Sequence, residues 1–140
     1  MKGLIFILSL IAIVSCGTTT TPKSGDELGY NGQSPGVFGY RSTQELLSSL
    51  KSDTENAVST VKGDYGVWTV VRSPSDNSLW SFTPAQHPAH PSVVKRTVSE
   101  EDGKIFINTQ ASCNAEKAAC DKLVNSFIQI NNKIRESFGA

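Results

Sequence analysis

Apolar residues follow two different periods along this chain, and each period predicts a different kind of element. Over residues 42–63 they recur every three to four positions, as on one face of a helix. Ser42 and Glu45 have the spacing of a capping box at a helix start, and Gly63 suits the position just after a helix end. The helical period returns over residues 114–138. We therefore expect an N-terminal helix and a long C-terminal helix.

Between these helices, four short segments are rich in β-branched and aromatic residues, which is typical of β-strands. The turn-forming sequence PSDN separates the first two segments, and an Asp-Gly step that favours a tight hairpin separates the last two. The segments cover residues 67–73, 79–83, 92–99 and 104–109. The order of elements predicts an α+β fold, with a four-stranded antiparallel meander between the two helices.

The N-terminus has the proportions of a secretory signal. Lys2 precedes residues 4–14, which are apolar apart from Ser9. As a helix, these residues would be about 16 Å long, roughly half the thickness of a bilayer core. The segment is therefore predicted to be a signal peptide and not a membrane span.

Residues 13–16, Ile-Val-Ser-Cys, follow that apolar segment and resemble the lipobox of bacterial lipoproteins. The resemblance implies that the Cys16 sulfur receives a diacylglyceryl group and that the chain is cut just before Cys16. Gly17, in place of aspartate, resembles the outer-membrane sorting pattern of enterobacterial lipoproteins. The expected location is the cell envelope, on the outer membrane of a Gram-negative bacterium. Each buried methylene of the acyl chains would contribute about 0.8 kcal/mol to anchoring.

The composition beyond the signal changes from flexible to compact. Residues 17–41 contain six glycines, four threonines and two prolines, which predict a tether. The expected organisation is a signal peptide at 1–15, a lipidated cysteine and tether at 16–41, and one α+β domain at 42–140. The chain has 13 basic and 13 acidic residues, and this balance argues against nucleic acid as a partner. Such a chain has no electrostatic hold on anionic lipids, so membrane attachment should depend on Cys16 alone.

Two cysteines remain if Cys16 carries lipid, and outside the cytoplasm we expect Cys113 and Cys120 to form a disulfide. Seven residues of continuous helix would separate their Cα atoms by about 10.5 Å, whereas a disulfide tolerates about 7 Å. The bond therefore requires Cys113 to lie before the helix and to fold back over its first turns.

A proline-rich connection carries both histidines, His87 and His90, and each precedes a proline. This context predicts an extended, polyproline-like segment in which the two side chains project from one side, about 9 Å apart. Three interpretations stay open. The histidines bond to the backbone of a stiff connection; the loop binds a partner or ligand; or the imidazoles bind zinc or copper, for which a third ligand is missing nearby. The candidate binding surface consists of Trp80, Phe82, Gln86, His87 and His90.

The remaining candidates for chemistry are weak. Lys95 and Arg96 are neighbours on a strand, so they should lie on opposite faces and form no basic patch. Motifs for a serine nucleophile, a phosphate loop or a zinc protease do not occur in the sequence, so we expect neither an enzyme nor a cofactor.

The predicted function is that of a lipid-anchored envelope protein with a small, non-enzymatic binding domain that interacts with another envelope component. One alternative is a protective lipoprotein that inhibits an incoming hydrolase such as lysozyme. Another is a small metal-binding or enzymatic domain that uses His87 and His90.

Overall fold

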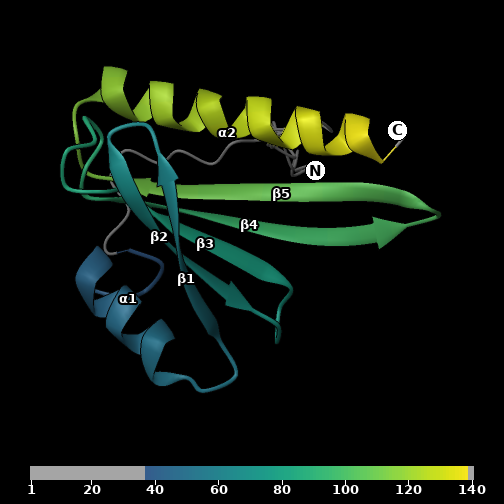
Figure 1. The fold of residues 1–140 in the computed structure, drawn as a ribbon, viewed down its shortest axis with the longest axis horizontal. Helices are drawn as coiled ribbons and strands as arrows, with labels where there is room; N and C mark the ends of the chain where they lie inside the picture. The colour runs from purple at the N-terminus through teal and green to yellow at the C-terminus, as the bar shows by residue number, and fades with distance from the viewer. Residues whose placement is uncertain (1–36, 139–140) are drawn as a thin grey trace, which may run out of the picture.

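The computed structural model describes residues 37–138, in which two helices pack on one antiparallel sheet (Figure 1). The sheet has five strands in the order β1-β2-β3-β4-β5, so each strand pairs with its neighbour in sequence. The predicted α+β class is confirmed, but the number of strands is five and not four. The elements are α1 (Thr43–Ser52), β1 (Ala57–Gly63), β2 (Gly66–Ser73), β3 (Ser78–Phe82), β4 (Ser92–Glu101), β5 (Lys104–Cys113) and α2 (Lys117–Ser137).

Helix α1 starts as predicted but is shorter than predicted. The Ser42 hydroxyl accepts a hydrogen bond from the Glu45 backbone N–H at 3.1 Å, which confirms the N-terminal cap. The helix ends at Ser52 instead of continuing to residue 63. The Asn56 side-chain amide donates to the Leu50 carbonyl at 2.9 Å, satisfying one carbonyl of the last helical turn.

Strand β1 occupies the part of the chain that was expected to complete the first helix. Its valines and threonine are β-branched and lose side-chain freedom in a helix, whereas they pack well on a pleated sheet. Val61 lies opposite Trp68, and Gly63 lies opposite Gly66 at the hairpin that joins β1 to β2. Gly63 is therefore the end of a strand and not the end of a helix.

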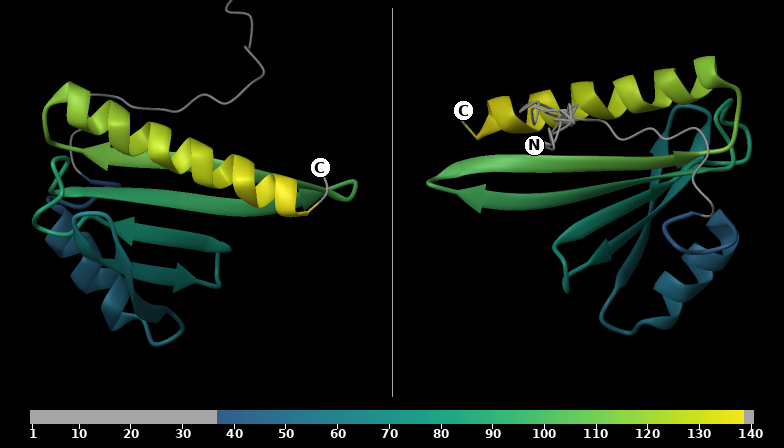
Figure 2. Two further views of the ribbon diagram at one scale, coloured as in Figure 1. Left: turned by 45° about the horizontal axis from the view of Figure 1, so that its top comes forward. Right: turned by 180° about the vertical axis from the view of Figure 1, so that it is seen from behind.

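The two helices lie on opposite faces of the sheet. Val93 and Val94 are neighbours on β4, so their side chains point to opposite faces, and both are fully buried. Val93 packs in a core with Leu46 of α1, and Val94 packs in a second core with Leu123 of α2. Figure 2 shows α2 running along β4 and β5, and α1 lying near β1 and β2.

The core beneath α1 also includes residues that precede the helix. Val37 is buried there, and its backbone forms two hydrogen bonds with Tyr40. The chain just before residue 42 therefore packs on the domain. The buried members of this core are Val37, Leu46, Val71, Trp80, Phe82 and Val93.

A disulfide joins Cys113, the last residue of β5, to Cys120 in the first turns of α2. Their Cα atoms lie 5.9 Å apart. The predicted pairing is confirmed, and so is its condition, because Cys113 precedes the helix, which starts at Lys117 instead of residue 114. The bond fixes the start of α2 to the end of the sheet.

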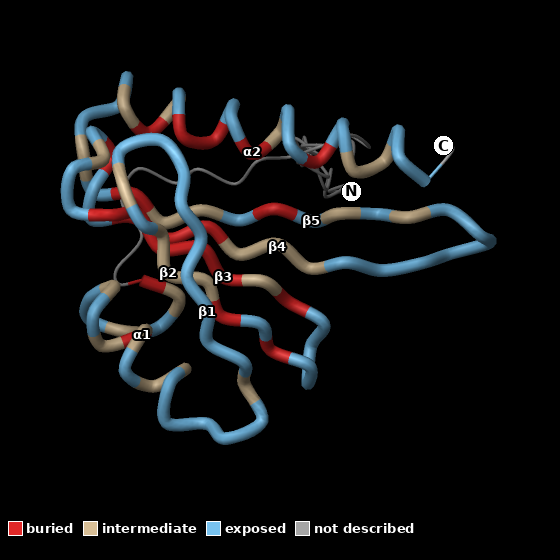
Figure 3. Tube along the Cα trace, viewed as in Figure 1, coloured by how far each residue is buried: buried red, intermediate tan, exposed pale blue. Residues whose placement is uncertain are grey.

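The β4–β5 hairpin extends beyond the rest of the sheet, and its far end is exposed (Figure 3). Asp102 and Gly103 at its turn both have positive φ, 52° and 74°, as the Asp-Gly signal predicts. Within residues 37–138, no helix is long and apolar enough to cross a membrane. The predicted signal peptide, the lipobox with Cys16 and most of the tether lie outside the described residues.

Candidate functional site

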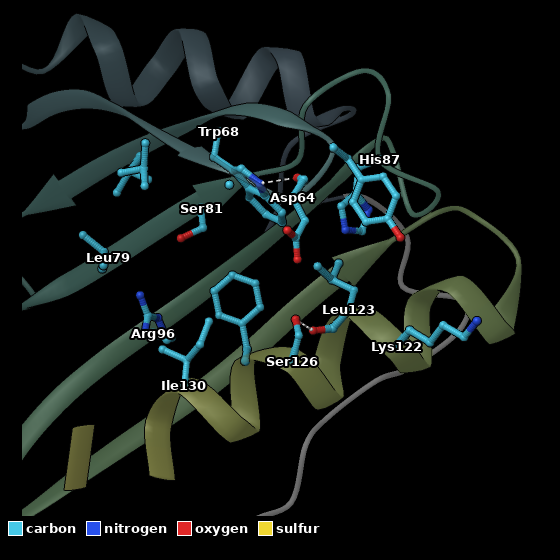
Figure 4. Close-up of a pocket in the computed structure, with 15 residues that line it drawn as sticks. Asp64, Trp68, Leu79, Ser81, His87, Arg96, Lys122, Leu123, Ser126 and Ile130 are labelled. Carbon is cyan, nitrogen blue, oxygen red and sulfur yellow. Dashed lines mark hydrogen bonds between the residues drawn. The ribbon is translucent and has the colours of Figure 1, made fainter. Parts of the chain in front are cut away.

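A groove of about 510 Å³ lies between the sheet and α2 (Figure 4). We call it the α2 groove. Its sheet side is formed by Val61, Trp68, Val70, Leu79, Ser81 and Arg96. Its helix side is formed by Lys122, Leu123, Ser126, Phe127 and Ile130. Residues 63–65 and His87 complete the lining. The volume is within the range of sites that bind small molecules.

The middle of the groove is aromatic and aliphatic. Trp68 and Phe127 face each other edge to face, with ring centroids 6.1 Å apart. The Trp68 indole N–H donates to the Asp64 carbonyl at 3.2 Å, which fixes the orientation of the ring. Val61 and Ile130 are 52% and 41% exposed although both are large and apolar. An apolar ligand in the groove would remove this surface from water, which is favourable.

Arg96 brings a positive charge into this apolar site. It lies opposite Leu79 on β3, and its guanidinium carbon is 5.2 Å from the centroid of the Phe127 ring. Within residues 37–138, its buried Nε atom has no hydrogen-bond partner and its side chain has no ion pair. Burial lowers the pKa of Arg96 below its ordinary value, but an arginine remains a cation at neutral pH.

The neighbouring cation, Lys95, is fully engaged on the other face of the sheet. Its ammonium group lies 2.7 Å from an Asp76 carboxylate oxygen and 4.8 Å from the centroid of the Trp80 ring. The two cations thus lie on opposite faces, as strand alternation predicts. One of them is paired, and the other faces the α2 groove without an acidic partner in the described part of the chain.

His87 lies at the other end of the groove, away from Arg96 (Figure 4). Its Nδ1 atom accepts a hydrogen bond from the Ala89 N–H at 3.0 Å, and its ring packs against the rings of Tyr65 and Trp68. Burial lowers the pKa of His87 from 6.5, the charge of His90 lowers it further, and Asp64 opposes both effects. His87 is thus held as a packing residue of the groove.

His90 has different surroundings from His87. Its Nδ1 atom donates to the Thr83 carbonyl at 3.1 Å. The segment forms two successive turns instead of the expected polyproline conformation. In the first, the His87 N–H donates to the Pro84 carbonyl, and in the second, the His90 N–H donates to the His87 carbonyl. The prediction that both imidazoles project from one side of an extended segment is therefore wrong. Among residues 37–138, no three His, Cys, Asp or Glu side chains are grouped to hold a metal ion.

The other members of the predicted binding surface are dispersed. Trp80 and Phe82 lie on the α1 face and are only 7% and 6% exposed. The Trp80 ring packs edge to face against Phe38, with 5.1 Å between centroids. Gln86 is exposed on the loop. Its Oε1 atom lies close to Gly66, 3.2 Å from the position that a Cβ atom would take there. The predicted surface that combines Trp80 and Phe82 with the loop is therefore not formed.

Sequence reasoning did not identify the α2 groove. The signal that could have indicated it was alternation on the strands, which puts Arg96 on the same face as Val94, and Trp68 on the same face as Val70. The position of α2 over β4 and β5 depends on tertiary packing and could not be derived from these local patterns.

Comparison of the chain with models of protein families, with curated proteins and with solved structures finds no significant match.

Proposed function

We propose that this chain is a lipid-anchored cell-envelope protein whose α+β domain is a non-enzymatic binding module, with the α2 groove as its binding site. The observation that carries the binding proposal is the exposed apolar lining of a groove of about 510 Å³. The resemblance of residues 13–16 to a lipobox supports the anchor.

The polar groups of the groove favour binding over catalysis. Arg96 is a permanent cation and cannot exchange a proton at neutral pH. His87 uses one ring nitrogen to accept the Ala89 N–H and packs its ring against two aromatic side chains. The residues between Arg96 and His87 are mainly apolar. Such a lining suits a ligand that is held and released without a chemical step.

The anchor is tested by Cys16→Ser in the full chain. We expect this variant to leave the membrane fraction of cells, because the acyl chains attached at Cys16 are the proposed hold on the lipid bilayer. Fractionation followed by immunoblotting measures the effect. A Cys16→Ser chain that stays with the membranes after high-salt washing would contradict the proposed anchor.

The binding site is tested with an uncharged dye that fluoresces in apolar surroundings. We expect Ile130→Glu to weaken dye binding at least tenfold, because it places a charge at the groove without changing a buried residue. The matched control is Val67→Glu, which alters a 58% exposed valine outside the groove. Equal dye binding by both variants and by the unaltered chain would refute the groove as the site.

One feature supports the inhibitor as a second candidate function. The β4–β5 hairpin continues past Thr97, the residue of β4 that pairs with the start of β3. Its far end is acidic, because the last two residues of β4 and the first turn residue are Glu100, Glu101 and Asp102. An acidic hairpin end is complementary in charge to a cationic hydrolase. Inhibition of lysozyme by the unaltered chain, and its loss when the three acidic residues are replaced by serine, would support this candidate. Absence of inhibition would exclude lysozyme as the target.

A further inference from the structure

The guanidinium of Arg96 is a charge of the α2 groove that has no acidic partner among the described residues. Among the described residues, Asp64 is the one acidic side chain that lines the groove, and it lies on the side toward His87, beside Trp68 (Figure 4). Arg96 lies near Leu79 and Ile130 instead. Four buried side-chain polar atoms in residues 37–138 lack a hydrogen-bond partner, and Arg96 Nε is the one whose residue lines the groove. Buried polar groups are rarely left unpaired in proteins. Because the Nε atom itself is buried, a ligand in the groove would approach the guanidinium through its Nη–H groups.

The geometry of a guanidinium selects among possible acceptors. Two Nη–H groups, one on each terminal nitrogen, point in parallel and match the two oxygens of a carboxylate. A phosphate monoester would also fit this fork, but it carries close to two negative charges at neutral pH. In a partly buried site, the free-energy cost of removing a second charge from water is larger than the stabilisation that one arginine provides. The surroundings of Arg96 therefore favour a carboxylate over a phosphate.

The rest of the groove defines what the carboxylate is attached to. Phe127 contacts the guanidinium of Arg96, and its ring also faces Trp68, which lies farther along the groove next to Val61. Together with Ile130 these side chains line the groove with aromatic and aliphatic surface. The groove is large enough for a small molecule of this kind. We infer that the α2 groove binds a small amphiphile with one carboxylate, whose apolar body lies along Trp68 and Phe127 and whose carboxylate pairs with Arg96. This inference rests on the proposed binding function of the groove.

The test compares ligands that differ in the head group alone. Decanoate, decan-1-ol and decyl phosphate are titrated by calorimetry at pH 7.5 into the chain carrying Cys16→Ser, so that no acyl group on the protein competes for the groove. We expect decanoate to bind at least tenfold tighter than either of the other two. Tenfold corresponds to about 1.4 kcal/mol, which is close to the lower end of what a hydrogen bond to a charged group contributes.

Three charge-neutralising variants assign the preference to Arg96. Arg96→Gln should bind decanoate and decan-1-ol within threefold of each other. Lys95→Gln, which removes the adjacent cation on the other face, should keep the tenfold preference. Lys122→Gln removes a second cation that lines the groove, and loss of the preference in this variant would assign the carboxylate to Lys122 and overturn the assignment to Arg96. Circular dichroism checks that each variant is folded.

The outcomes separate this inference from the function on which it rests. If the unaltered groove binds decanoate and decan-1-ol equally, or if Arg96→Gln keeps the preference, the carboxylate assignment is overturned while the groove remains a binding site. Tighter binding of decyl phosphate would replace the carboxylate by a phosphate and also overturn it. If none of the three ligands binds and the uncharged dye also fails to bind, the proposed function falls together with the inference.

Discussion

Helices lie on both faces of the sheet, and beneath α1 the central strands are closed off from solvent, while Val67 near the edge of that face stays exposed. There, Trp80 and Phe82 are buried against α1 and the residues that precede it. On the other face, α2 follows β4 and β5 and leaves Trp68 and Val61 at the side of a groove. The short helix α1 completes a core with β2, β3 and β4, whereas the longer helix α2 forms a core and also one side of a groove.

The adjacent cations of β4, Lys95 and Arg96, show the same difference in how their charges are paired. Lys95 on the closed face has an acidic partner in Asp76 and an aromatic ring beneath it. Arg96 on the open face has the aromatic ring of Phe127 without an acidic partner in the described chain. Structural cations are normally paired, so the unpaired one is the better candidate for contact with a ligand.

The largest expected effect is the loss of an aromatic residue from the closed face. Phe82→Ala should lower the free energy of unfolding by roughly 3–5 kcal/mol, because a buried phenyl ring leaves a cavity that the core cannot fill. Ile130→Ala on the open face should cost about 1 kcal/mol or less, because this side chain is already 41% exposed. Urea denaturation measures both. Similar losses would contradict the distinction between a closed and an open face.

The second effect concerns the attachment of α2. Replacing Cys113 and Cys120 by serine should cost about 2.5 kcal/mol, because the bond closes a short loop in the unfolded chain. Hydrogen exchange should become faster in the first turns of α2 while α1 keeps its protection, since the disulfide joins α2 to β5. Uniformly faster exchange in both helices would show that the two faces do not unfold separately.

A smaller effect separates the two cations. Lys95→Met should lower the free energy of unfolding by about 1 kcal/mol, because it breaks a partly buried ion pair and a contact with Trp80. Arg96→Met should leave this free energy unchanged within about 0.5 kcal/mol, or raise it, because it removes a desolvated charge that has no acidic partner. A loss at Arg96 as large as that at Lys95 would make Arg96 a structural residue.

The smallest expected effect is a dependence on pH at the His87 end of the groove. The folded chain favours neutral His87, since burial lowers its pKa. Its contribution to stability is therefore fully present above pH 6.5, the ordinary pKa, and is lost as pH falls through the lowered value in the folded chain. NMR titration of the imidazole measures the pKa directly, and His87→Phe should flatten the decline in stability between pH 7 and 5. Titration of His87 at or above 6.5 would contradict this.

Local patterns were sufficient for most of the fold. The capping residues, the Asp-Gly turn and the β-branched segments predicted the start of α1, the β4–β5 hairpin and four of the strands, and the cysteine count predicted the disulfide. Strand β1 was missed because its alanine and valines also match a helical period, and because pairing with β2 decides the outcome. The site was missed for a related reason, since the sequence places Arg96 on a face but does not show which side chains approach it from α2.

The two tryptophans provide the most direct test of the central difference, because each belongs to one face. Titration of ¹⁵N-labelled chain carrying Cys16→Ser with decanoate can be followed at the two indole N–H signals. We expect the Trp68 signal to shift saturably, since its ring lines the groove, and the Trp80 signal to stay in place beneath α1. Equal shifts of both signals, or a shift of Trp80 alone, would contradict the assignment of binding to the open face.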